Sequence, residues 1–87
     1  MSDNKKIQRE KIDLLENEGF VFSKKREIYI QRKTKKILSN IIVEDSSIED
    51  LKKLISDKNT SGEYTFYFEY TLNDKIKQEI IEELSTE

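Results

Sequence analysis

The chain has no histidine and no cysteine among its 87 residues. In enzymes these side chains supply the common general base, many nucleophiles and the usual transition-metal ligands, so catalysis and metal binding of those kinds are excluded within the chain. The lack of cysteine also rules out a disulfide framework, which suits a reducing compartment. We therefore expect a protein that is not an enzyme and that holds no metal and no other cofactor.

Glycine is nearly absent, with two residues in the whole chain. A phosphate-binding loop or a dinucleotide fingerprint needs several closely spaced glycines, which let the backbone approach the phosphates. Carboxylates are abundant, but adjacent pairs such as Glu82 and Glu83 lie on predicted helices, where neighbouring side chains point about 100° apart. We expect such pairs to be solvated surface, and an enzyme that uses carboxylates with a divalent metal is the remaining catalytic alternative.

Long apolar runs are missing too. No stretch approaches the roughly 20 apolar residues that cross a bilayer, and the polar N-terminal segment lacks the apolar core of a secretion signal, so we expect a soluble, cytoplasmic protein. Leu, Ile, Val and Phe still make up 25 of the 87 residues, which favours a folded chain. Because no repeat, low-complexity tract or linker is present, residues 1–87 are predicted to form a single domain.

Proline, alanine and tryptophan are also absent, whereas isoleucine, lysine and the acidic residues abound. This skew is typical of a low G+C coding bias. It favours an AT-rich bacterium, or one of its phages or plasmids, as the source.

The patterns that are present predict the element order α-β-β-β-α-β-α. A helix over residues 3–18 ends at Gly19, where a left-handed residue is needed, with Phe20 folding back on Leu14 or Leu15. Runs at residues 20–22, 27–32 and 36–44 predict an antiparallel meander with loops of four or five residues built on type I turns. The predicted fold class is α+β, with a mostly antiparallel sheet of three or four strands packed against helices.

Two capping boxes and one strand follow the meander. Ser46 with Glu49 predicts the start of a helix, and Thr71 with Asp74 predicts the start of the last helix. Between them, residues 63–70 alternate aromatic and polar side chains and form the clearest strand in the chain. The last helix is expected to pack through a stripe made of Leu72, Ile76, Ile80, Ile81 and Leu84.

Charge is segregated along the chain, with +6 over residues 24–36, −7 over residues 37–87 and −1 over residues 1–23. The basic run could contact nucleic-acid phosphates, with Tyr29 stacking on a base, or could form the polar turns of a hairpin whose lysines discourage edge pairing. Because a predicted strand separates its two turns by roughly 20 Å, we expect two small basic poles. The candidate nucleic-acid-binding residues are Lys24, Lys25, Arg26, Arg32, Lys33, Lys35 and Lys36.

The acidic C-terminal half offers a second candidate surface. Its carboxylates could imitate a phosphate backbone and dock on a protein that normally holds nucleic acid, or could serve solubility alone. Acids at helix starts, such as Asp74, are already explained by capping and the helix dipole. The candidates for binding a partner are Asp57, Glu63, Glu69, Glu79, Glu82 and Glu83.

The predicted sheet has two apolar faces. One face carries Ile28, Ile30, Ile41, Val43, Phe66 and Phe68, which we expect to face the core. Strand alternation then places a second apolar set on the opposite face, which is either covered by a helix or forms an interface with a partner or a second copy of the chain. The residues of that second set are Tyr29, Leu38, Ile42 and Tyr67.

Small size, the missing catalytic side chains and the polarised charge favour a non-enzymatic protein-binding module. The order helix, three-stranded meander, helix is similar to that of some small phage anti-CRISPR proteins, a likeness of architecture without a shared motif. We therefore expect an inhibitor or accessory factor of phage or mobile-element type that docks on a nucleic-acid-handling protein in an anti-defence or regulatory role. The alternative is a protein that binds DNA or RNA directly through the basic turns 24–26 and 32–36, and a homodimer is left open.

Overall fold

The computed structural model describes the backbone of residues 2–86 and the side chains of residues 8–86, and this part of the chain forms four helices and four strands. In chain order these are α1 (Ser2–Asn17), β1 (Val21–Ser23), β2 (Ile28–Gln31), β3 (Lys36–Ser39), α2 (Asn40–Asp45), α3 (Ile48–Ser56), β4 (Thr65–Tyr67) and α4 (Asp74–Ser85). The predicted α+β class and element order are confirmed, with the short helix α2 as an addition. No helix in the described part of the chain combines the length and the apolar character that a bilayer crossing requires.

The strands form one mixed sheet in the order β1-β2-β3-β4. β1 with β2 and β2 with β3 pair antiparallel, joined by four-residue turns at 24–27 and 32–35. Neither turn contains glycine, and Glu27 and Lys35 take up the left-handed backbone that each turn needs, with φ of 55° and 56°. β3 and β4 pair in parallel, because the chain returns from the end of β3 to the start of β4 through α2 and α3.

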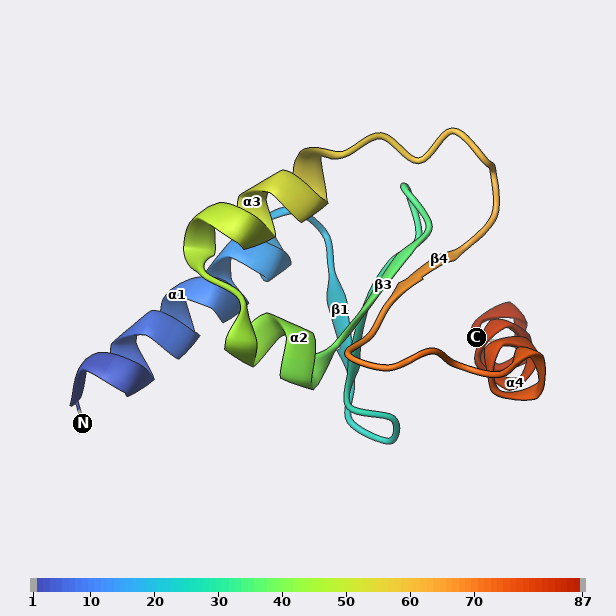
Figure 1. Cartoon of the computed structure of the whole chain (residues 1–87), viewed down its shortest axis with the longest axis horizontal. Helices are drawn as coiled ribbons and strands as arrows, with labels where there is room; N and C mark the ends of the chain where they lie inside the picture. Colours follow the sequence, from blue (N-terminus) through green and yellow to red (C-terminus); the bar gives the residue numbers. More distant parts are fainter. Residues whose placement is uncertain (1, 87) are drawn as a thin grey trace.

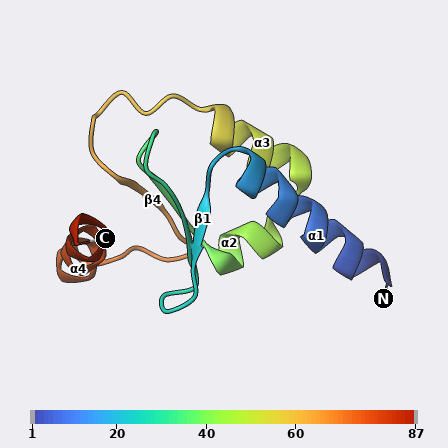
Figure 2. The same ribbon diagram turned by 180° about the vertical axis from the view of Figure 1, so that it is seen from behind.

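The sheet separates two apolar cores. Helices α1, α2 and α3 cover one face, and α4 covers the other (Figure 1; Figure 2 shows the same layers from behind). The core on the α1 side, here called the first core, contains the buried residues Leu15, Phe20, Tyr29, Leu38, Val43 and Leu51. The second core, on the α4 side, contains the buried residues Ile28, Ile30, Ile37, Leu72, Ile80 and Leu84.

The end of α1 follows the sequence prediction. Gly19 adopts φ 92°, its N–H donates to the Glu16 carbonyl at 3.0 Å, and the Phe20 N–H donates to the Leu15 carbonyl at 2.9 Å. This pair of bonds is the Schellman arrangement, and Phe20 is buried in the first core beside Leu15. A glycine and the apolar residue after it thus set the direction in which the chain enters β1.

Residues 40–44 do not continue the third strand, so that part of the predicted strand is wrong. β3 ends at Ser39, whose hydroxyl accepts the N–H of Ile42 at 3.1 Å and caps α2. Val43, expected on the same core face as Ile28 and Ile30, is buried in the first core, whereas they lie in the second. Ile41, expected to face the core, is 49% exposed. The packing of Val43 beneath α1 outweighs the strand preference of these β-branched residues.

The starts of α3 and α4 lie one and two residues later than the predicted capping boxes. Ser47, not Ser46, caps α3, and Asn73, not Thr71, caps α4; each side chain accepts the backbone N–H three residues further on. The capping chemistry is therefore as expected. Neighbouring residues with the same capability cannot be told apart from spacing alone.

Candidate binding site beside strand β1

The candidate site is a groove of about 640 Å³ beside β1, here called the β1 groove. Within residues 2–86, β1 pairs only with β2, so its outer edge borders no other strand. Val21 and Phe22 on this edge strand are 68% and 44% exposed. The residues that line the groove are Gly19, Val21, Phe22, Ser23, Lys24, Lys25, Ile30, Arg32, Lys33 and Leu84.

Four cations line the β1 groove, and no acid is among its described lining residues. Lys24 and Lys25 come from the first turn, and Arg32 and Lys33 come from the second, at the other end of β2. The two basic poles expected from the sequence thus border a single groove, with apolar side chains between them. This combination favours a ligand that is apolar in its middle and negatively charged towards its ends.

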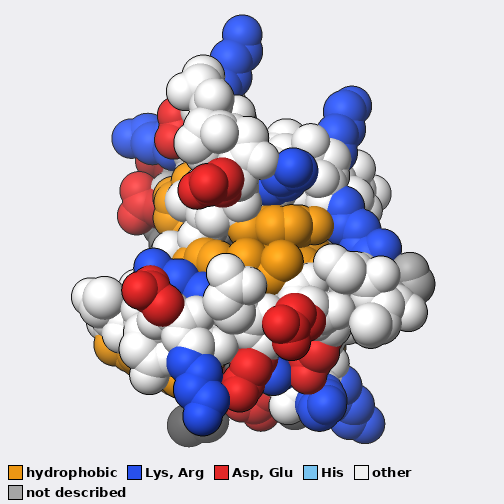
Figure 3. All heavy atoms as spheres, turned by 90° about the vertical axis from the view of Figure 1, so that its right-hand side faces the viewer, with side chains coloured by type: hydrophobic (Ala, Val, Ile, Leu, Met, Phe, Trp, Pro, Cys, Tyr) orange, Lys and Arg blue, Asp and Glu red, His pale blue; other side chains and the backbone are white. Residues whose placement is uncertain are grey.

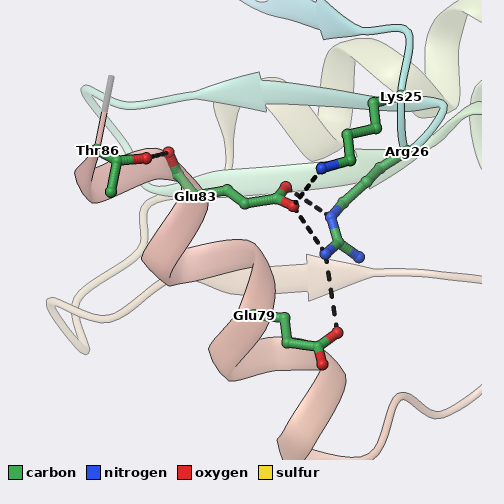
Figure 4. A network of polar contacts seen from close by, with 5 residues as sticks. All are labelled: Lys25, Arg26, Glu79, Glu83 and Thr86. Carbon is green, nitrogen blue, oxygen red and sulfur yellow. Dashed lines mark hydrogen bonds and ion pairs between the residues drawn. The ribbon is translucent and has the colours of Figure 1, made fainter.

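Helix α4 holds part of the first turn through the ion pairs shown in Figure 4. Arg26 contacts Glu83 with both arms of its guanidinium, Nε to Oε2 at 2.7 Å and Nη2 to Oε1 at 3.0 Å, and lies 3.8 Å from Glu79. The Lys25 ammonium lies 3.2 Å from Glu83 Oε1. Hydrogen bonds from Arg26 and Lys25 lower the pKa of Glu83 to about 2.

Lys36 is fully buried, so its predicted role in binding nucleic acid is wrong. Its ammonium donates to the carbonyl oxygens of Leu54 and Ile55, the second at 2.8 Å, at the C-terminal end of α3. That end of a helix carries unpaired carbonyls and the negative pole of the dipole, which favour a cation. Desolvation in this buried position lowers the pKa of Lys36.

Lys35 and Arg32 also contact backbone carbonyls. Lys35 donates to Gly62 at 2.9 Å on the β4 side of the sheet, away from the β1 groove. Arg32 lines the groove and places Nη2 3.4 Å from the Leu84 carbonyl, near the end of α4. The seven basic candidates therefore do not form one phosphate-binding surface.

The acidic candidates are likewise divided. Glu83 and Glu79 face the first basic turn, and Glu69 accepts a hydrogen bond from the Ser39 hydroxyl at 2.6 Å. The remaining three are exposed and lie at the end of α3, in the loop before β4 and on α4, at Asp57, Glu63 and Glu82. Pairing within the chain weakens the case for an acidic surface that imitates a phosphate backbone.

The second apolar sheet face is covered by helices, so it is not an open partner surface. Leu38 and Tyr29 are buried in the first core, and Tyr67 packs against the same core. Burial raises the pKa of both tyrosines. Ile42 lies half-buried on α2 and is not part of the sheet. Of the two alternatives drawn from the sequence, cover by helices is the one that the structure contains.

A second groove, of about 870 Å³, lies between β4 and α4. Figure 3 shows this side of the molecule, where an apolar patch lies in a hollow framed by charged side chains. Tyr64, Phe66 and Ile81 contribute apolar lining, and the charged lining residues have both signs: Lys35, Lys77, Glu63 and Asp74. Its balanced charge selects no sign of ligand, in contrast to the β1 groove.

The exposed residues Val21 and Phe22 were missed as site residues by sequence reasoning. The apolar run at residues 20–22 predicts a strand but does not say which of its side chains stay exposed. The available signal is position, because the first strand of a meander has a neighbour on one side only.

No group of three or more acidic side chains that could hold a metal ion occurs among the side chains of residues 8–86. Comparison with protein-family models, with curated proteins and with solved structures finds no match to this chain. Function is therefore argued from the geometry of the β1 groove.

Proposed function

We propose that this chain is a non-enzymatic binding module that docks on another protein through the β1 groove. The observation that carries the proposal is an open edge strand with exposed Val21 and Phe22, beside a groove lined by four basic residues and no described acidic one. Apolar surface supplies most of the binding free energy at such sites, and complementary charge supplies orientation and rate. The partner surface is correspondingly apolar with carboxylates around it.

Two observations favour a protein over a nucleic acid as the partner. Of the seven basic candidates, Lys36 is buried, Lys35 lies on the far side of the sheet, and Arg26 is paired with Glu83. Nucleic-acid affinity depends largely on the number of phosphates that are neutralised. Lys24, Lys25, Arg32 and Lys33 remain at the groove, and Lys25 also contacts Glu83. The apolar floor between the two turns suits an apolar side chain better than a phosphate backbone.

In its narrower form, the proposal is an inhibitor or accessory factor of phage or mobile-element type that acts on a nucleic-acid-handling protein. The coding bias and the missing catalytic side chains support this form. Polymerases and nucleases commonly hold two metal ions with clustered carboxylates, and such clusters have the charge that the β1 groove accepts. A cytoplasmic location fits the same reading.

Site-specific photo-crosslinking tests the proposal. A photoreactive phenylalanine derivative replaces Val21, and the chain is irradiated in a lysate of an AT-rich bacterium, with and without nuclease. We expect an adduct with an acidic protein, identified by mass spectrometry, that survives nuclease and that does not form from the same group at the exposed Lys52 on α3.

The identified protein is then purified, and its affinity for two charge-matched variants is measured. Lys24→Glu with Lys33→Glu reverses two groove cations and should weaken binding about tenfold, whereas Lys52→Glu with Lys58→Glu reverses two cations elsewhere and should not. Equal loss in both variants, or an adduct that nuclease removes, would contradict a protein-binding role for the β1 groove.

A further inference from the structure

We infer that the occupant of the β1 groove is an extended peptide segment that adds to β1 as a fifth strand, with acidic residues at positions i and i+4 and an apolar residue at i+2. The inference rests on the proposed function and names the chemistry and the conformation of the partner segment.

The backbone of β1 is open to a further strand. β1 is the first strand in the sheet order, and its three residues pair with β2 alone within residues 2–86. An edge strand presents unpaired N–H and C=O groups, and an extended peptide that satisfies them gains affinity from main-chain hydrogen bonds. The sheet therefore has a place for one more strand beside β1.

The spacing of charge on the occupant follows from the length of β2. The turn with Lys24 and Lys25 and the turn with Arg32 and Lys33 flank its four residues. The flanking positions 27 and 32 are five steps apart, about 16 Å at roughly 3.3 Å per residue. Side chains that point to one face of a strand recur every second residue, so positions i and i+4 are about 13 Å apart, and the long lysine and arginine side chains cover the difference. One carboxylate then reaches each basic pole.

The middle of the groove sets the residue between the two acids. Val21 pairs with Ile30 in the strand register, so both side chains point to the α4 side, where Leu84 also lines the groove. Position i+2 of an added strand faces these apolar side chains. Phe22 points to the opposite face, where its ring lies 4.8 Å from that of Tyr29, and offers a contact to an apolar residue at i+1 or i+3.

Charge also argues against a second copy of this chain as the occupant. In an antiparallel pair of two β1 strands, each basic turn of one copy would lie opposite a basic pole of the other. Like charges at both ends oppose that pairing, whereas they favour a strand that carries acids at its ends. The occupant is thus a segment of a different protein.

Synthetic peptides test the inference on the full chain. A fluorescein-labelled peptide of nine residues carries Asp at its third and seventh positions and Val at its fifth, in a Thr background, and binding is followed by anisotropy. We expect about tenfold weaker binding when the two Asp residues are moved two positions apart, and a larger loss when both are Lys. Methylation of alternate backbone nitrogens, which removes strand hydrogen-bond donors and keeps every charge, should abolish binding.

Two readouts on the chain complete the experiment. The bound peptide should slow hydrogen exchange in β1, and the variant with Lys24→Glu and Lys33→Glu should lose binding while the variant with Lys52→Glu and Lys58→Glu keeps it. Binding that ignores acid spacing and backbone methylation would overturn strand addition. A photo-crosslink from Val21 without binding of any peptide would contradict the acidic strand as occupant but would still support the β1 groove as a protein-docking surface. Tighter binding of an oligo-thymidine strand than of the peptide would contradict both the acidic strand and the protein-docking role.

Discussion

At the scale of single residues, the two buried lysines act as partners for helix ends. Lys36 contacts the last carbonyls of α3, and the buried Lys11 donates to the Glu44 carbonyl at 2.7 Å, near the end of α2. Only α1 ends on a glycine, because the chain has so few. Lysine ammonium groups supply the donors that C-terminal helical carbonyls otherwise lack.

Replacement of Lys36 by methionine tests this role. The methionine keeps much of the apolar volume but leaves the Leu54 and Ile55 carbonyls without their donor, so we expect a loss of about 1–3 kcal/mol in the free energy of unfolding. Lys33→Met changes an exposed lysine three residues away and should stay within about 0.5 kcal/mol of the parent. Urea denaturation measures both, and equal effects would show that the buried ammonium contributes nothing specific.

At the scale of elements, the start of α3 offers a sharp comparison between neighbours. The Ser47 hydroxyl accepts the Asp50 N–H at 3.1 Å, whereas Ser46 contributes its backbone N–H to the end of α2. Ser47→Ala should therefore cost about 1 kcal/mol and Ser46→Ala much less. Thermal or urea unfolding of the two variants measures both losses. A larger loss for Ser46→Ala than for Ser47→Ala would instead support the capping box predicted from the sequence.

Some elements of the fold could be predicted from the sequence, and others could not. The end of α1, the four-residue turns and the alternation of β4 follow from local chemistry that the sequence displays. Helix α2 does not, because residues 40–44 are β-branched in large part and become helical only through the capping by Ser39 and the burial of Val43. Tertiary packing decides such segments, and it is invisible in a local pattern.

The candidate site was harder to predict for a related reason. Arg26 and Glu83 are 57 positions apart, and their ion pair converts a basic turn and an acidic helix into a neutralised contact. Nothing in either segment indicates the other. The charge map of the sequence therefore overstated the separation of charge on the folded surface.

The contact between the first turn and α4 predicts a pH dependence. The pKa of Glu83 in the folded chain is about 2, below its ordinary value of 4.5, because Arg26 and Lys25 stabilise the carboxylate. A lowered pKa in the folded state means that this contribution to stability is present above pH 4.5 and is lost as the pH falls through about 2. The urea midpoint of the parent chain should thus exceed that of Glu83→Gln at neutral pH, and the gap should close across this window.

Glu82 provides the matched control for that measurement. It precedes Glu83 on α4 and is exposed, and it takes part in none of the ion pairs among the side chains of residues 8–86. The difference in urea midpoint between the parent chain and Glu82→Gln should stay the same over this pH range. If both variants behave alike, general acid titration and not the Arg26 contact accounts for the change.

At the scale of the whole molecule, one thin sheet has to support two cores in a chain of 87 residues. A domain of this size buries a modest share of its surface, so each core is small. Each buried side chain therefore contributes a large part of the apolar contact in its core. Strand β3 contributes to both, because Ile37 points towards α4 and Leu38 points towards α1 and α3. Neighbouring positions on β3 should therefore report on different halves of the molecule.

Ile37→Ala and Leu38→Ala test this division. Both side chains are fully buried, so each truncation should cost about 2–5 kcal/mol, whereas Ile41→Ala, at an exposed position of α2, should cost well under half of that. Native-state hydrogen exchange should accelerate first in α4 for the Ile37 variant and first in α1 and α3 for the Leu38 variant. If the alanine variants do not fold, Ile37→Val and Leu38→Val, with smaller losses, give the same comparison. Uniform acceleration in both variants would mean that the two cores open as one cooperative unit and that α4 is not a separately stabilised layer.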